Sequence, residues 1–244
     1  MGKNNYHDGL IIYRRIISNL KNAVVNKFLN NPIYQKFIAK NILNQNKYKA
    51  TKKSLYNLSN SLSMEQSSDE LKYYISIDLI AANFNSCRLY DKDLVFGFES
   101  WEDLLCSVNT ELGITEIDNF KLLIRSNKYL RQIIFGQLNC NKIMSFSRYL
   151  IDQVCDQLIT NKVIEKDQLI LVMHDEIIIR SGFDHVNLVD RISQVLQNSI
   201  CNIYPILRIQ SFDFRNFEKL EFYIKRVWYD HIKGSVMIIS KEVS

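Results

Sequence analysis

An acidic step separates two runs of strand-forming residues in the second half of the chain. The runs cover residues 169–173 and 177–179, and His174, Asp175 and Glu176 lie between them with no Gly or Pro. This pattern predicts a strand, a tight connection and a second strand. Aliphatic strands this continuous are usually buried, and a buried carboxylate is costly unless a cation or hydrogen-bond donors meet it. The step therefore predicts a divalent-metal site, with an acidic turn on an exposed hairpin as the alternative.

Another carboxylate lies at the end of an earlier apolar segment. Residues 73–79 predict a strand that carries Asp78 near its end, and residues 80–90 predict a short helix after it. An Asp here is expected either as a metal ligand or as the N-cap of that helix. If the strand pairs with the hairpin, Asp78 and Asp175 converge and can hold two Mg²⁺ or Mn²⁺ ions. Ions held in this way bind a triphosphate and activate a 3′-hydroxyl for in-line attack.

The elements around these acids predict a single sheet. From residue 69 onward the pattern predicts, in order, a strand, helices, the hairpin, a helix and further strands. The helices are expected over residues 99–137, 143–161 and 188–200, and the later strands over 205–212, 221–228 and 235–240. This order is the split β-α-β arrangement of a ferredoxin-like antiparallel sheet, in which the first strand and the hairpin are neighbours. The expected fold class is therefore α+β, with helices packed on the sheet.

The charge of the chain is unevenly distributed. Residues 1–64 carry eleven basic side chains and the single Asp8, a net charge of +10, whereas residues 65–244 carry 20 basic and 25 acidic side chains, a net charge of −5. Amphipathic helices are expected over residues 10–30, 33–46 and 50–62. The lysines expected to follow a phosphate backbone are Lys36, Lys40, Lys47, Lys49, Lys52 and Lys53. We expect residues 1–68 to form a basic helical region for nucleic acid; a solvated helical face and a surface for an acidic partner are the alternatives.

Three further basic residues recur at a helical interval. Arg125, Lys128 and Arg131 lie three positions apart in a helix expected over residues 120–136. Side chains at this spacing drift slowly around one helix face and can meet one anion. We expect them to bind a triphosphate or a template strand, with a solvated face as the alternative.

The acidic segments together resemble a known family. Residues 171–179 resemble the His-Asp-Glu hairpin of family A DNA polymerases, within the wider superfamily that includes single-subunit RNA polymerases. The segment Ser76-Ile77-Asp78 is similar to that family's first catalytic strand, and residues 143–161 occupy the place of the helix before the hairpin. The resemblance covers roughly residues 72–230 in consistent order. It implies that residues 69–244 form a palm domain.

The resemblance also implies an activity and residue roles. It implies a palm-type nucleotidyltransferase that uses Mg²⁺ or Mn²⁺ to add nucleotides to the 3′ end of DNA or RNA. Asp78 and Asp175 would bind metal, and Glu176 would assist them. His174 and Asn83, with the basic residues at 125, 128 and 131, would bind the nucleoside triphosphate. The basic helices at the N-terminus would serve as a shortened thumb or as a partner-binding region.

Two departures from the family limit these expectations. The family has a Glu five positions after its first catalytic Asp, where this chain has Asn83. The interval between the two acids is also shorter, so the fingers are expected to be reduced to about residues 99–140 or supplied by a protein partner. A catalytically inactive palm-fold subunit that binds nucleic acid or joins a complex is the main alternative. An unrelated α+β scaffold protein with an acidic turn is the other.

Composition excludes several classes of protein. The five cysteines are odd in number and scattered, with no CxxC pair, which argues against a disulfide framework or a zinc site and for a reducing compartment, cytoplasmic or nuclear. Aliphatic runs are far shorter than the roughly 20 residues of a membrane span, and no signal-peptide pattern opens the chain. We therefore expect a soluble protein that is neither secreted nor embedded in a membrane.

Overall fold

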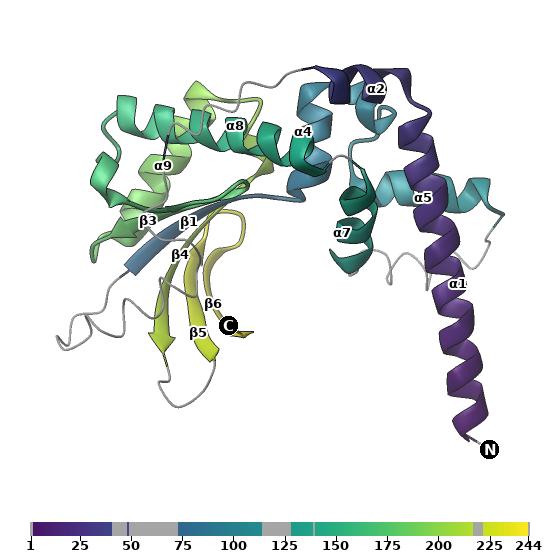
Figure 1. Ribbon diagram of the computed structural model, residues 1–244. Helices are drawn as coiled ribbons and strands as arrows, with labels where there is room; N and C mark the ends of the chain where they lie inside the picture. Colours follow the sequence, from purple (N-terminus) through teal and green to yellow (C-terminus); the bar gives the residue numbers. More distant parts are fainter. Residues whose placement is uncertain are drawn as a thin grey trace. The chain divides into compact units, whose positions relative to one another are not determined.

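The computed structural model describes residues 2–40, 48, 73–113, 128–138, 140–216 and 222–243 (Figure 1). Contacts divide the chain into two compact units, each made of two segments. Residues 1–43 and 83–144 form one, here called the helical unit, and residues 44–82 and 145–244 form the other, here called the sheet unit. The expected boundary at residue 68 lies outside the described residues, and the observed division differs from it. The N-terminal helices share a core with residues 83–144 instead of standing alone.

The helical unit contains five α-helices among its described residues. They are α1 (Gly2–Leu29), α2 (Pro32–Ala39), α4 (Ala82–Tyr90), α5 (Trp101–Glu111) and α7 (Lys128–Gln137). The break that Pro32 predicts is confirmed, because α1 ends at Leu29 and Pro32 opens α2. Asn31 caps α2 by accepting hydrogen bonds from the backbone N–H groups of Ile33 at 2.9 Å and Tyr34 at 3.4 Å. The expected helix over residues 50–62 lies outside the described residues.

An aromatic cluster explains why the N-terminal helices join residues 83–144. Phe28, at the end of α1, is fully buried and meets Tyr34, Phe96 and Phe135 edge to face, with ring centroids 5.4 to 5.8 Å apart. Edge-to-face pairs add to the free energy gained by burying these rings. Helices α1 and α2 are therefore amphipathic in the usual way: their apolar residues lie in this core, and Lys36 and Lys40 are exposed.

The sheet unit confirms the predicted α+β fold and the split β-α-β order. Its strands are β1 (Tyr73–Leu79), β2 (Leu169–Val172), β3 (Glu176–Ser181), β4 (Leu207–Asn216), β5 (Phe222–Asp230) and β6 (Gly234–Val243). They form one antiparallel sheet in the order β2-β3-β1-β4-β5-β6. The first four strands have the ferredoxin-like order, and β5 and β6 extend the sheet beyond β4. Helices α8 (Cys140–Thr160) and α9 (His185–Ser199) lie over one face of this sheet (Figure 1).

Strand register separates the two faces of the sheet. Ser211 of β4 lies 2.9 Å from Nδ1 of His185 on α9, so its side chain marks the helix-covered face. Ile75 lies opposite Ser211, and Ile77 follows on the same face; both are fully buried. The alternate residues of β1, which include Ser76 and Asp78, therefore project from the opposite face.

The face away from the helices changes character along the strands. Near the start of β1 it carries a buried apolar cluster that includes Tyr74, Ile178 and Phe212. Toward the end of β1 the same face carries Ser76 and Asp78. Within the described part of the chain, no helix has the length and apolar character that crossing a bilayer requires.

Candidate functional site

The acidic site begins with a pair of like charges on neighbouring strands. Asp78 of β1 lies directly opposite Glu176 of β3. The backbone N–H of Leu79 donates to the carbonyl of Asp175 at 2.8 Å, so the next pair along, Asp78 with Glu176, is a non-hydrogen-bonded pair. Side chains are closest in such pairs, with Cβ atoms about 4.5–5.5 Å apart. Because like charges in this position destabilise a sheet, a cation at this point would be stabilising.

Glu176 is held on this face by a hydrogen bond. The hydroxyl of Ser76 donates to Oε1 of Glu176 at 2.5 Å. Ser76 is buried, whereas Asp78 and Glu176 are both half-buried. The pair is therefore accessible from outside while its position is fixed by strand pairing and by Ser76. Glu176 thus belongs to β3, although the sequence pattern places it in the connection between the strands.

Asp175 lies in a two-residue turn next to this pair. The N–H of Met173 donates to the carbonyl of Glu176 at 2.7 Å, which leaves only His174 and Asp175 in the connection. His174 is exposed and Asp175 is half-buried. The turn lies beside the end of β1, as the sheet order predicts, because the carbonyl of Asp175 accepts a hydrogen bond from the N–H of Leu79. The alternative of a helix cap is excluded for Asp78, because Asp78 pairs within β1 and α4 begins only at Ala82.

These carboxylates suit a magnesium-type ion whose coordination shell is completed by oxygen atoms of a substrate. Among the described residues, no group of three or more His, Cys, Asp and Glu side chains is arranged to hold a metal ion by itself. Mg²⁺ in nucleotide enzymes is usually bound through one or two carboxylates, with water and substrate phosphates completing the shell. The paired carboxylates of Asp78 and Glu176, next to the Asp175 turn, have the oxygen chemistry and the number of donors for that kind of site.

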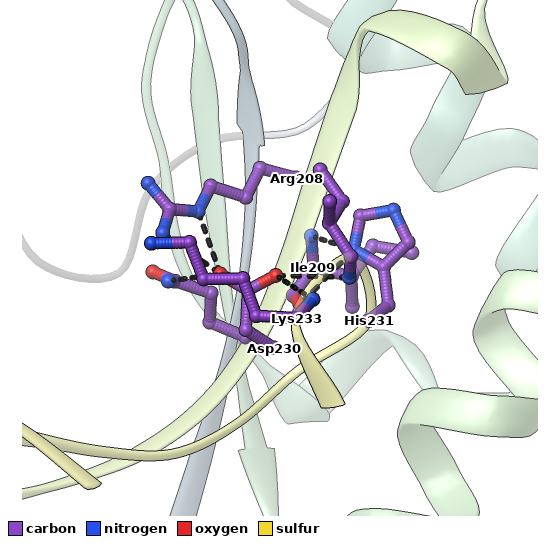
Figure 2. A network of polar contacts seen from close by, with 7 residues as sticks. Arg208, Ile209, Asp230, His231 and Lys233 are labelled. Carbon is purple, nitrogen blue, oxygen red and sulfur yellow. Dashed lines mark hydrogen bonds and ion pairs between the residues drawn. The ribbon is translucent and has the colours of Figure 1, made fainter. Parts of the chain in front are cut away.

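A basic residue that the sequence analysis missed lies on the other side of Asp78. Register places Arg208 of β4 directly opposite Asp78, on the face away from the helices. Its guanidinium is anchored by Asp230 of β5, to whose Oδ2 the Nε donates at 2.8 Å (Figure 2). Across this face the order of charges is therefore Glu176, Asp78, Arg208 and Asp230. Alternation along residues 205–212, combined with the predicted sheet order, was the signal that could have placed Arg208 here.

Asp230 is a fully buried carboxylate with several hydrogen-bond donors. Its Oδ2 also accepts from Nε2 of Gln210 at 2.8 Å, and its Oδ1 accepts from the backbone N–H groups of Ile232 at 2.9 Å and Lys233 at 3.4 Å. Burial opposes ionisation and would raise the pKa of Asp230. The hydrogen bonds from Arg208, Gln210 and Ile232, with the charge of Arg208, outweigh burial and hold that pKa below its usual value.

Backbone contacts tie the same turn to the rest of the sheet. Figure 2 shows His231 beside Ile209: the N–H of Ile209 donates to Nδ1 of His231 at 2.9 Å, and the N–H of His231 donates to the carbonyl of Ile209 at 3.0 Å. The β5–β6 turn is thereby fixed against β4 next to Arg208. The backbone of β4 around Arg208 is therefore held by β1 on one side and by the β5–β6 turn on the other.

A second residue that the sequence pattern did not identify, Arg148 of α8, binds the backbone of the acidic hairpin. Its side chain is buried and forms an ion pair with Asp152, one turn along the helix, at 3.1 Å. Its Nη1 donates to the carbonyl of Val172 at 2.8 Å and to that of Met173 at 3.3 Å, and its Nη2 donates to the carbonyl of Tyr48. Val172 and Met173 immediately precede the His174–Asp175 turn. Arg148 therefore fixes the end of β2 where the acidic turn begins.

The remaining predicted site residues lie in the helical unit or outside the described residues. Asn83 is half-buried on α4, Lys128 opens α7, and Arg131 is half-buried on α7. Lys36 and Lys40 are exposed on and just after α2. The positions outside the described residues are Arg125, Lys47, Lys49, Lys52 and Lys53. The contacts described above for the acidic pair are made within the sheet unit.

The site is thus defined by geometry alone. Comparison of the chain with protein-family models, with curated proteins and with solved structures finds no match in any of the three.

Proposed function

We propose that this chain is a palm-type nucleotidyltransferase that adds nucleotides to the 3′ end of a nucleic acid with the help of Mg²⁺ or Mn²⁺. The observation that carries the proposal is the Asp78–Glu176 pair. Two carboxylates of like charge lie opposite each other at the ends of two central strands, on the face that the helices leave open. The pair is half-buried, and carboxylate oxygens are the donors through which nucleotide enzymes bind Mg²⁺.

The proposed reaction assigns metal binding to the acidic residues and positioning to Ser76 and Arg148. Asp78 and Glu176, with Asp175 in the adjacent turn, would hold the divalent ions, which neutralise the charge of the triphosphate and lower the pKa of an attacking 3′-hydroxyl. Ser76 keeps the Glu176 carboxylate on the open face by donating a hydrogen bond to it. Arg148 keeps the hairpin in register by binding the carbonyls that precede the turn. Catalysis of this type depends mainly on positioning and charge, and these contacts provide positioning.

The proposal is tested by extension of a labelled primer, with and without a template, at millimolar Mg²⁺ or Mn²⁺. Wild-type protein should add nucleotides, and Asp78→Asn and Asp175→Asn should each abolish addition without loss of folding. Asp167→Asn is the matched control, because Asp167 is an exposed aspartate that precedes β2, at the other end of that strand from the turn. Equal activity in wild type, Asp78→Asn and Asp175→Asn would refute the proposal. A wild type that binds nucleic acid but adds nothing would favour the inactive palm-fold subunit.

A further inference from the structure

Arg208 differs from the other charged residues of the site in having donors to spare. Its side chain is 35% exposed, whereas its anchor Asp230 is fully buried. Its Nε donates a hydrogen bond to Oδ2 of Asp230 at 2.8 Å, and its Nη2 forms an ion pair with the same oxygen at 2.8 Å. Within the described part of the chain, its second terminal nitrogen, Nη1, has no partner. A guanidinium has five N–H groups in a planar fork, so part of that fork remains available to a ligand.

The anchor gives Arg208 a fixed orientation. Asp230 receives hydrogen bonds from Gln210 and from two backbone N–H groups of the β5–β6 turn, so it cannot follow the guanidinium if that group moves (Figure 2). A side chain held by a buried and saturated partner loses little further entropy when it binds a ligand. Arg208 is therefore a preorganised cation on the open face of the sheet.

We infer that Arg208 binds a phosphate group of the nucleotide that the acidic pair receives, an inference that rests on the proposed function. Asp78 lies directly opposite Arg208 in the sheet, so an ion held by Asp78 and Glu176 and the guanidinium of Arg208 approach from adjacent strands. A polyphosphate needs several positive charges at once, and a planar guanidinium matches phosphate oxygens in a two-pronged geometry. The ion and Arg208 together provide that combination.

Binding of Mn²⁺ and of inorganic tripolyphosphate tests the inference. Mn²⁺ affinity is measured by the loss of the free-ion EPR signal, and tripolyphosphate affinity by calorimetry at saturating Mn²⁺. Arg208→Gln should leave Mn²⁺ affinity within about twofold and weaken tripolyphosphate about tenfold or more, since the lost contact is a charge-assisted hydrogen bond. Arg180→Gln is the matched control, because Arg180 is an exposed arginine of β3 on the same sheet face, opposite Tyr74. It should change neither affinity.

Two further variants separate ligand binding from folding. Arg208→Lys keeps the charge near Asp230 but loses the fork, and should restore only part of the tripolyphosphate affinity. The double variant Arg208→Gln with Asp230→Asn removes the buried charge together with its partner, and should bind tripolyphosphate as weakly as Arg208→Gln. Equal tripolyphosphate affinity in wild type and Arg208→Gln would overturn the inference.

Failure of the proposed function gives a different result. If the proposed metal site is wrong, Asp78→Asn will bind Mn²⁺ as tightly as wild type does. Tripolyphosphate binding is then measured in the absence of metal. Weaker binding by Arg208→Gln under those conditions still supports an anion site at Arg208. Equal binding by wild type and Arg208→Gln overturns it.

Discussion

Replacement of Arg148 by Met should unfold the sheet unit at markedly lower denaturant concentration. Arg148 and Asp152 form an ion pair whose two side chains are each only 8% exposed. Arg148→Met removes the cation and leaves the Asp152 carboxylate in a buried site without it. Removing one partner of a buried ion pair typically costs about 3–5 kcal/mol. The carbonyls of Val172 and Met173 also lose their charged donor, which places the expected cost at the upper end of that range.

The two tryptophans allow this cost to be assigned to one unit. Trp101 is buried in the core of the helical unit, and Trp228 lies on β5 of the sheet unit. In a Trp101→Phe background, urea unfolding followed by fluorescence therefore reports the sheet unit through Trp228 alone. Linear extrapolation gives the free energy of unfolding for each variant. Arg180→Met is the control for loss of an exposed arginine and should change stability by no more than about 0.5 kcal/mol.

A double variant tests the physical reason. Arg148→Met with Asp152→Leu removes both charges, so the free-energy cost of burying the Asp152 carboxylate without Arg148 disappears. Only the hydrogen bonds from Arg148 to the backbone carbonyls remain lost. The double variant should therefore be more stable than Arg148→Met by about 2 kcal/mol, because uncharged replacements of buried ion pairs are often nearly neutral. A cost below about 1 kcal/mol for Arg148→Met would refute the argument. So would a double variant less stable than the single one.

The remaining predictions concern the sugar, nucleic acid and pH. If nucleotides are added, discrimination between ribo- and deoxynucleotides should be poor, and Asn83→Glu should raise the preference for deoxynucleotides in matched incorporation assays, since a longer charged side chain can exclude a 2′-hydroxyl. If the basic helices bind nucleic acid, replacing both Lys36 and Lys40 with Gln should weaken binding to DNA and RNA regardless of sequence. It should also reduce the slope of log affinity against log salt by about 1–2, because two exposed positive charges are lost. Deletion of the N-terminal segment would be a poor test of the same idea, since it also removes Phe28 from the core. The pKa of Asp230 is lower in the folded state than in the unfolded state. Its carboxylate therefore stabilises the fold above the unfolded-state pKa of about 3.9, and this stabilisation is lost as the pH falls through the lower folded-state pKa. Acid unfolding curves of Asp230→Asn should lack this pH dependence.

The sequence was most informative where apolar periodicity is strong. The strand at residues 73–79 and the hairpin after residue 168 were predicted because their aliphatic runs are continuous and bounded by polar residues. The split β-α-β order then followed from the order of elements, and with it the proximity of Asp78 to the hairpin. The position of Glu176 within β3 was missed, because a charged residue at a strand end looks the same in sequence as a turn residue.

Long-range contacts were beyond the sequence pattern for a physical reason. Arg148 was hidden in a helix whose apolar stripe is equally well formed with any polar residue at that position, so nothing local shows that its charge is buried. Asp230 lies beyond the strand expected over residues 221–228, and nothing local marks it as a site residue because its donors come from β4 and from the turn that follows it. The grouping of the N-terminal helices with residues 83–144 depends on which apolar faces meet, and amphipathicity does not specify a partner.

The two arginines near the acidic turn differ in what a ligand can reach. Arg148 is buried and its contacts are with one carboxylate and three backbone carbonyls, so a substrate would have to displace protein groups to bind it. Arg208 is anchored on a single carboxylate oxygen and keeps part of its guanidinium at the surface. A substitution at Arg148 should therefore lower stability and metal affinity together, since it moves the turn that carries Asp175. A substitution at Arg208 should lower phosphate affinity while metal affinity holds, and this separation of effects distinguishes a residue that shapes the site from one that contacts the substrate.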